Sequence, residues 1–128
     1  MAGIVPNNVI RIPCNNIRLF RYWLELLAPF HHLTDREIDV ATAFLVEYEN
    51  LKKVVLDKSL LDKTLMSEDV QKDIREKCGL ASQNFKVIRS KLRTKKFLIN
   101  DKINPKMIPN VKWDDDSFQL LLVFEYQK

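Results

Sequence analysis

The sequence predicts a single domain with a mainly α fold and a small β portion near its C-terminal end. Apolar residues recur at helical spacing in most segments up to residue 96. Gly79 separates two of these segments, and glycine is the residue that most readily ends a helix in the left-handed conformation. After Lys96 the pattern becomes that of a short strand at residues 97–99. The length of 128 residues suits one domain with a modest core.

The first part of the chain, residues 1–33, is predicted to form an arm and a helix. Residues 9–12 combine apolar and basic side chains and fit either a short strand or an extended arm. Asn15 or Asn16 offers an N-cap for a helix over residues 16–28, which Pro29 ends. One apolar stripe of this helix consists of Ile17, Phe20, Leu24 and Leu27. Further apolar surface comes from Tyr22, Trp23, Leu26 and Phe30, so the helix is expected to serve dimerisation.

A helical core is predicted over residues 34–96. Thr34 and Glu37 have the spacing of a capping box, in which each side chain satisfies a backbone amide of the other residue. The longest helix follows, with an apolar stripe made of Ile38, Ala41, Leu45, Tyr48 and Val55. Residues 57–66 fit either a continuation of that helix or a short turn.

Residues 70–99 indicate a helix-turn-helix followed by a strand, with the two helices spanning residues 67–96. Ser67 is a suitable N-cap, and Gly79 ends the first helix. The second helix is predicted to begin near Ala81 or Ser82. Its apolar stripe consists of Ala81, Phe85, Ile88 and Leu92. Two helices that meet steeply through a short glycine-containing turn leave one polar face of the second helix free.

The last part of the chain, residues 97–128, is predicted to form a wing and a C-terminal strand. Asn100 and Asp101 indicate a turn after the first short strand, and residues 103–116 are expected to be mostly loop. A final strand is predicted from the alternation of Phe118, Leu120, Leu122, Phe124 and Tyr126. Because Leu121 and Val123 are apolar on the other face, this strand is expected to be covered on both sides.

The positive charge of the chain is concentrated in one stretch. The net charge is +4, and residues 86–96 carry six basic residues and no acidic one. No other segment of the chain has an excess above two. A focused basic patch indicates a partner such as a phosphate backbone rather than a feature of the fold.

The stretch from residue 73 to residue 98 resembles the winged helix-turn-helix superfamily. Ile74 matches the inward position of the first helix, Gly79 the turn glycine and Leu80 the apolar residue that closes the turn. The buried positions of the second helix are matched by Phe85, Ile88 and Leu92. Residues 34–46 resemble the helix that precedes the motif. The resemblance implies a winged helix-turn-helix with an added N-terminal helix, and three residues depart from its usual pattern: Arg75, Ala81 and Lys96.

Residues 82–96 are predicted to read duplex DNA. Gln83 and Asn84 suit adenine edges, and Arg89 or Arg93 suits guanine. The hydroxyl or amide of Ser82 suits a phosphate at the helix N-terminus, and Ser90 completes the polar face. Phosphate contacts are predicted for Lys86, Lys91, Lys95 and Lys96, and wing contacts for Lys102 and Lys106. The corresponding function is a small, oligomeric transcription regulator in the cytoplasm. The alternative reading of the same stretch is a solvated basic helix face.

A second function stays open from the sequence. The chain is also similar in general texture to small helix-turn-helix proteins of tailed phages, and winged helices also serve as protein-binding modules. A phage virion or DNA-packaging assembly protein would use the fold as a structural block in the host cytoplasm or the virion, and its partners would be other phage structural proteins.

Other chemistry is not expected. No nucleophile set and no phosphate-binding glycine loop occurs, so the protein is predicted not to be an enzyme and to need no cofactor. Two cysteines, Cys14 and Cys78, make neither a disulfide framework nor a zinc cluster. His31 and His32 are expected to be solvated near a helix end, and the acidic run at residues 114–116 to be a solvated turn rather than a metal site. No apolar run reaches the length of a membrane span.

Overall fold

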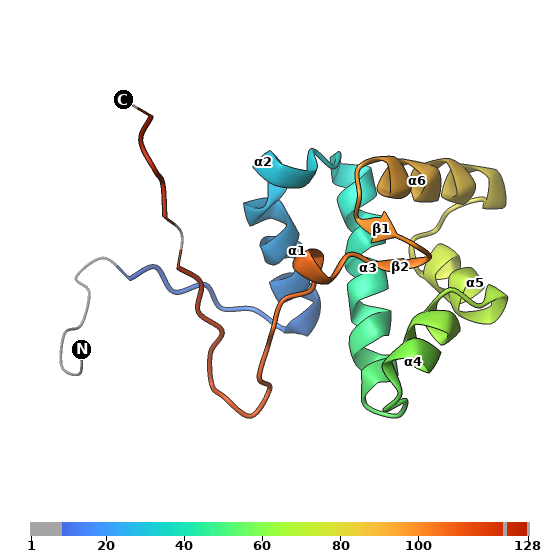
Figure 1. The fold of residues 1–128 in the computed structure, drawn as a ribbon, viewed down its shortest axis with the longest axis horizontal. Coiled ribbons are helices and arrows are strands. Elements are labelled where there is room, and N and C mark those ends of the chain that lie inside the picture. Colours follow the sequence, from blue (N-terminus) through green and yellow to red (C-terminus); the bar gives the residue numbers. More distant parts are fainter. Residues whose placement is uncertain (1–8, 122, 128) are drawn as a thin grey trace.

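A computed structural model describes residues 9–121 and 123–127 of the chain; residues 1–8, 122 and 128 lie outside this description. It is mainly helical with one small antiparallel sheet, which confirms the coarse fold class (Figure 1). The helices are α1 (Asn16–Leu26), α2 (Ala28–His31), α3 (Asp35–Lys52), α4 (Lys58–Leu65), α5 (Glu68–Lys77) and α6 (Ser82–Thr94). The strands β1 (Leu98–Ile99) and β2 (Lys102–Ile103) and the 3₁₀ helix η1 (Pro105–Met107) follow. None of the helices described is long and apolar enough to span a bilayer.

Helix α3 is the centre of the fold and contacts α1, α4, α5 and α6 (Figure 1). Its start is the predicted capping box: the Glu37 amide donates to Thr34 Oγ1 over 3.3 Å, and the Thr34 amide donates to Glu37 Oε1 over 3.1 Å. Ile38, Ala41, Leu45 and Tyr48 of the predicted stripe are buried on this helix, as are Val40 and Phe44, whereas Val55 lies beyond the end of α3 and is half-buried. The segment at residues 57–66 is neither a continuation nor a mere turn, because Asp57 caps a separate helix, α4.

The N-terminal helix is shorter than predicted, because α1 ends at Leu26 and a separate short helix, α2, begins at Ala28. Pro29 lies in the first turn of α2, where its missing N–H leaves no intrahelical bond unmade. The prediction that His31 is solvated is wrong. Its side chain is 2% exposed, Nδ1 accepts from the Leu33 amide over 2.9 Å, and Nε2 lies 2.6 Å from the Leu24 carbonyl. This pairing places the proton on Nε2, so His31 is a neutral core residue, whereas His32 is exposed.

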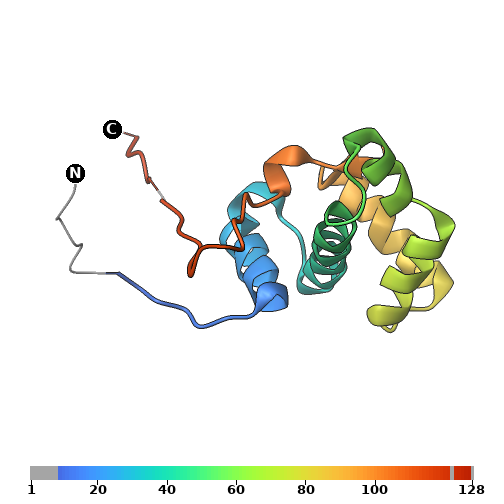
Figure 2. The same cartoon turned by 90° about the horizontal axis from the view of Figure 1, so that it is seen from below.

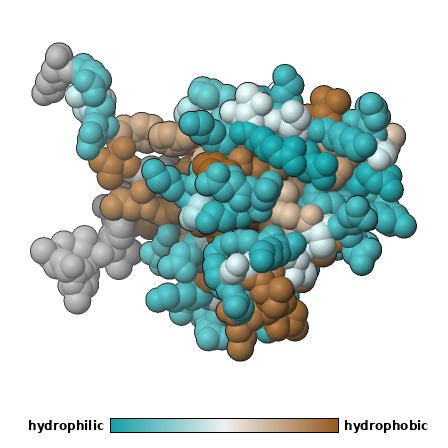
Figure 3. All heavy atoms as spheres, turned by 45° about the vertical axis from the view of Figure 1, so that its right-hand side comes forward, coloured by the Kyte–Doolittle hydropathy of each residue, from teal (hydrophilic) through white to brown (hydrophobic). Residues whose placement is uncertain are grey.

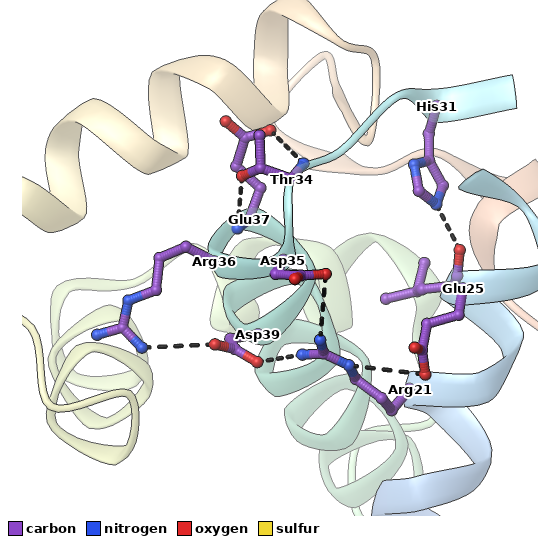
Figure 4. A network of polar contacts seen from close by, with 9 residues as sticks. Arg21, Glu25, His31, Thr34, Asp35, Arg36, Glu37 and Asp39 are labelled. Carbon is purple, nitrogen blue, oxygen red and sulfur yellow. Dashed lines mark hydrogen bonds and ion pairs between the residues drawn. The ribbon is translucent and has the colours of Figure 1, made fainter. Parts of the chain in front are cut away.

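A cluster of charged side chains fastens α1 to α3 (Figure 4). Arg21 on α1 pairs with Asp39 on α3, and its other contacts are Asp35 and Glu25, each at 3.8 Å. Arg36 approaches Asp39 from the opposite side, at 3.5 Å. The side chain of Arg21 is about three-quarters buried. This cluster is therefore expected to contribute more to stability than an isolated, exposed ion pair, whose contribution is small.

The α5 and α6 helices both end in the same backbone motif. At the end of α5 the Gly79 amide donates to the Glu76 carbonyl and the Leu80 amide to the Arg75 carbonyl, with Gly79 at a φ of +64°. At the end of α6 the Lys96 and Phe97 amides donate to the Arg93 and Leu92 carbonyls, and Lys96 has a φ of +64°. Both are Schellman motifs. Lys96, which stands where the resemblance expects a glycine, therefore adopts the left-handed conformation that glycine usually adopts at this position.

The hairpin after α6 is short. Leu98 pairs with Ile103 and Ile99 with Lys102, and the two residues between the strands, Asn100 and Asp101, both have positive φ. This is the two-residue turn that the Asn-Asp pair predicted. Leu98 and Ile103 are buried, and the hairpin contacts α6 and α4.

Of the two alternatives for residues 9–12, the extended arm is confirmed, because these residues are exposed and form no strand. The predicted C-terminal strand is wrong within the described residues. Residues 118–121 and 123–127 form no strand, and Leu121, Val123 and Phe124 are exposed rather than covered on both sides; Leu122 lies outside the description. The chain around this segment is held by aromatic contacts, in which Trp113 meets Phe20 and Phe118 meets Trp23 edge to face. Both figures of the ribbon show arm and C-terminal segment leaving the body on the α1 side (Figures 1 and 2).

Candidate nucleic-acid interface

Helix α6 lies on the side of the molecule opposite residues 9–14 and the C-terminal segment (Figures 1 and 2). Phe85 and Leu92 bury its inner face and Ile88 packs against the core. The exposed residues of the helix are Ser82, Gln83, Asn84, Lys86, Val87, Ser90, Lys91, Arg93 and Thr94. No acidic residue occurs on α6. Figure 3 turns this side of the molecule forward and shows that hydrophilic residues cover most of it.

The start of α6 has free backbone amides. Its N-cap is Ala81, whose side chain cannot accept a hydrogen bond, and Ser82 does not cap the helix either. Ser82 is the first helical residue and is exposed. The first N–H groups of a helix have no intrahelical partner and carry the positive end of the helix dipole. They are a suitable place for an anion only in combination with the basic side chains around them.

Six of the predicted DNA-contacting residues are exposed on α6, with Ser82 and Lys86 beside α5 and Asn84 on the side of Arg36. They are Ser82, Gln83, Asn84, Lys86, Ser90 and Arg93, and Lys91 is exposed beside them. No ion pair between described residues involves Lys86, Lys91 or Arg93. Within the part of the chain that the structure describes, no ion pair neutralises these three charges, so they are available to a binding partner.

Arg89 is half-buried in the groove between α5 and α6, which Ser82 and Lys86 also line. Its Nη1 donates to Oε1 of Gln71 on α5 over 3.1 Å, and its guanidinium stands 5.4 Å from the centre of the Phe85 ring. Burial lowers the pKa of Arg89, with a smaller contribution from Arg93. Arg89 therefore joins the two helices, and a base contact would require it to leave Gln71.

Lys95 is also held by the protein itself. Its Nζ donates to the His32 carbonyl over 2.9 Å and to Glu37 Oε1 over 2.5 Å. Burial alone would raise the pKa of Glu37, but the hydrogen bonds from Lys95 and from the Thr34 amide hold that pKa below its ordinary value. Lys95 thus fastens the end of α6 to the start of α3 and has little freedom to contact a phosphate.

The remaining predicted lysines follow α6. Lys96 is exposed at the end of the helix, Lys102 is half-buried on β2, and Lys106 is exposed on η1. Because the hairpin turns after two residues per strand, it does not extend as a long loop. The structure therefore brings Lys96 close to the α6 face but supplies no long wing to carry Lys102 away from the body.

The α5–α6 groove contains basic residues that sequence reasoning missed. It is open, has a volume of about 440 Å³, and is lined by one carboxylate, that of Glu68, and by four basic residues. Of these, Lys86 and Arg89 were predicted, whereas Lys72 and Arg75 were missed. Arg75 was identified only as a departure from the usual small residue. It donates from Nη1 to the Leu80 carbonyl over 3.1 Å and so stabilises the turn between the helices.

Val87 is a second residue that was missed. It is 57% exposed among the polar residues of the α6 face. The signal was present in the sequence, since Val87 falls outside the buried stripe of Phe85, Ile88 and Leu92.

No family model, no curated protein and no solved structure matches this chain.

Proposed function

We propose that this protein is a winged helix-turn-helix protein that binds duplex DNA through the exposed face of α6. The observation that carries the proposal is the α6 face itself, on which Lys86, Lys91 and Arg93 have no acidic partner among the described residues. The major groove of B-DNA is wide enough for one α-helix. An exposed helix with bidentate polar side chains and flanking lysines suits that groove.

The residues of the face divide into two roles. Gln83, Asn84 and Arg93 carry groups that pair with base edges, and Val87 suits the methyl group of thymine. Lys86, Lys91 and Lys96 suit phosphates, which supply affinity but little sequence preference. Ser82 and the uncapped amides beside it suit one further phosphate. Arg89 and Lys95 support the geometry of the helix instead.

The biological role that fits this binding is transcription regulation by an oligomer. Leu26 and Phe30 stay exposed on α1 and α2, whereas Trp23 is half-buried against Phe118. Part of the apolar surface expected for dimerisation is therefore present. Repeated copies on DNA strengthen binding by presenting several α6 faces at once.

The proposal is tested with the full chain and a fluorescent duplex of random sequence over a series of salt concentrations. Binding that weakens steeply with salt is expected, because each neutralised phosphate adds about 0.9 to the slope of log K against log salt. Absence of binding at low salt would contradict the proposal.

One observation favours a second candidate, an assembly protein of a phage virion or DNA-packaging apparatus. The arm and the C-terminal segment expose many large apolar residues, more than a monomer usually leaves in contact with water. A protein of this kind would assemble into a ring of many copies and would not require DNA. Its mass in solution, together with the salt series, separates the two candidates.

A further inference from the structure

Most of the large apolar residues that are exposed among the described residues gather on one side of the molecule, where residues 9–14 and the C-terminal segment leave the body. We define the arm as residues 9–14 and the tail as residues 118–121 and 123–127. On the arm and the adjoining α1, the exposed apolar residues are Val9, Ile10, Ile12 and Ile17, and on the tail they are Leu120, Leu121, Val123, Phe124 and Tyr126. Figures 1 and 2 both show arm and tail leaving on the side opposite α6.

The backbone of both segments lacks partners. No backbone hydrogen bond between described residues involves residues 9–14 or the tail. The tail nevertheless has the composition of a strand, with aromatic and β-branched residues and no proline or glycine. An extended segment with unpaired backbone groups and strand-forming side chains is the kind of segment that adds to another strand.

Arm and tail are complementary in charge. The arm carries Arg11 and the start of α1 carries Arg18, with no acidic residue, whereas the tail carries Glu125 and no basic residue, and Asp114, Asp115 and Asp116 lie just before it. No ion pair between described residues involves Arg11, Arg18 or Glu125. The two segments therefore carry unpaired charges of opposite sign, and two copies of the same chain can pair them.

A single copy is not sufficient to cover the tail. Its apolar residues occur at consecutive positions, so both faces of a strand at this place are apolar and require cover on two sides. A two-stranded ribbon made from one copy's own arm and tail would leave a face in water and is marginally stable. A second copy adds a further arm and the exposed side chains of Leu26 and Phe30.

We infer that the tail of one copy binds as a β-strand along the arm of a second copy of this chain. Arg11 of the arm pairs with Glu125 of the tail, and the apolar faces of the tail are covered by α1 and α2 of that second copy. A reciprocal exchange gives a dimer, and a head-to-tail exchange gives a ring or a filament. This inference does not depend on DNA binding, since α6 lies on the opposite side of the molecule.

The first experiment measures the mass of the full chain by sedimentation over a wide range of protein concentration. The unmodified chain is expected to be a dimer or larger. The double variant Leu121→Ser with Phe124→Ser is expected to weaken association at least tenfold, because two large apolar side chains lose their cover. The matched control, Val54→Ser with Leu56→Ser, changes two equally exposed residues between α3 and α4 and is expected to associate normally. Association that survives the tail variant, or a chain that is monomeric throughout, overturns the inference.

The second experiment tests the pairing of arm with tail by reversing charges. Arg11→Glu alone and Glu125→Arg alone are each expected to weaken association roughly two- to fivefold, as for an exposed ion pair. The two changes combined are expected to restore it, because the charges then attract again. Losses that add up in the combined variant exclude this pairing. Circular dichroism of each variant checks that the helical body is unchanged.

Discussion

Arg89 Nη1 donates a hydrogen bond to Gln71 Oε1 over 3.1 Å, and this contact joins the α6 helix to α5. Gln71 is buried, and its own Nε2 donates to the Leu65 carbonyl over 2.9 Å. The pair therefore links three helices, since Leu65 ends α4. Arg89 therefore has a structural role, whereas Arg93 makes no ion pair with any described residue.

Gln71→Ala is expected to destabilise the protein by about 1–3 kcal/mol, because it leaves the Leu65 carbonyl and the Arg89 guanidinium without their partner. Urea unfolding followed by circular dichroism measures the change. Gln83→Ala, an exposed glutamine on α6, is the control and is expected to change stability by less than about 0.5 kcal/mol. Equal effects of the two substitutions would show that the Gln71–Arg89 contact contributes nothing.

Arg89→Ala and Arg93→Ala are expected to act on different properties. Arg89→Ala lowers the free energy of unfolding by about 1–2 kcal/mol, because it removes the contacts with Gln71 and Phe85. Arg93→Ala leaves stability nearly unchanged and weakens DNA binding by about 1–3 kcal/mol if it contacts guanine. Thermal unfolding and duplex titration are measured on both variants. A stronger DNA effect at position 89 than at position 93 would reverse the assignment.

Lys96 and Gly79 occupy the same position in two Schellman motifs and have the same φ of +64°. A lysine in this region is strained, because its Cβ approaches the backbone. Lys96→Gly is therefore expected to stabilise the protein by about 0.5–1 kcal/mol, and Gly79→Ala to destabilise it by about 1 kcal/mol. Both values come from urea unfolding. If Lys96→Gly destabilises, the lysine side chain makes contacts that outweigh its strain.

Stability is expected to depend on pH through His31. Burial lowers the pKa of His31 below its ordinary value of 6.5, with a smaller opposing effect of the Leu24 carbonyl. As the pH falls below about 6.5, the unfolded chain takes up a proton before the folded chain does, so stability decreases. The Glu37 pKa is lowered, so its contribution is present above the ordinary value of 4.5 and is lost below the folded-state pKa. His31 and Glu37 therefore change the stability of the protein in separate pH ranges.

The measurement is the free energy of unfolding between pH 5 and pH 8 in the unmodified chain and in His31→Gln. The variant is expected to have a lower overall stability but a flatter pH dependence near 6. His32→Gln, at the exposed neighbour that contributes only a smaller part of the lowering of the His31 pKa, is expected to change the slope much less than His31→Gln does. A slope that His31→Gln leaves unchanged would mean that another group causes it.

Local sequence signals predicted the parts of the fold that depend on local physics. The capping box of Thr34 and Glu37, the helix end at Gly79 and the turn at Asn100 and Asp101 depend on residues close together in the chain, and all three were confirmed. The buried stripe of α3 followed from its periodicity in the same way.

Long-range contacts could not be predicted in this way. The burial of His31 depends on a carbonyl seven residues away and on how α2 packs, and the roles of Arg89 and Lys95 depend on partners on other helices. The alternation at Phe118–Tyr126 measures the tendency to form a strand but does not supply a partner. The described residues of that segment are mostly exposed and form no strand. The pattern therefore predicted a strand for which one copy of the chain provides no neighbouring strand.

The most direct test of DNA binding by α6 compares two triple variants of equal net charge. Lys86→Gln, Lys91→Gln and Arg93→Gln remove three charges from the α6 face, whereas Lys52→Gln, Lys53→Gln and Lys63→Gln remove three exposed charges near α3 and α4. The first variant is expected to lose about 2–3 from the slope of log K against log salt for random duplex DNA, and the second variant to lose little. Equal slopes in both variants, or no binding by the unmodified chain at low salt, would contradict the assignment of α6 as a DNA-binding helix.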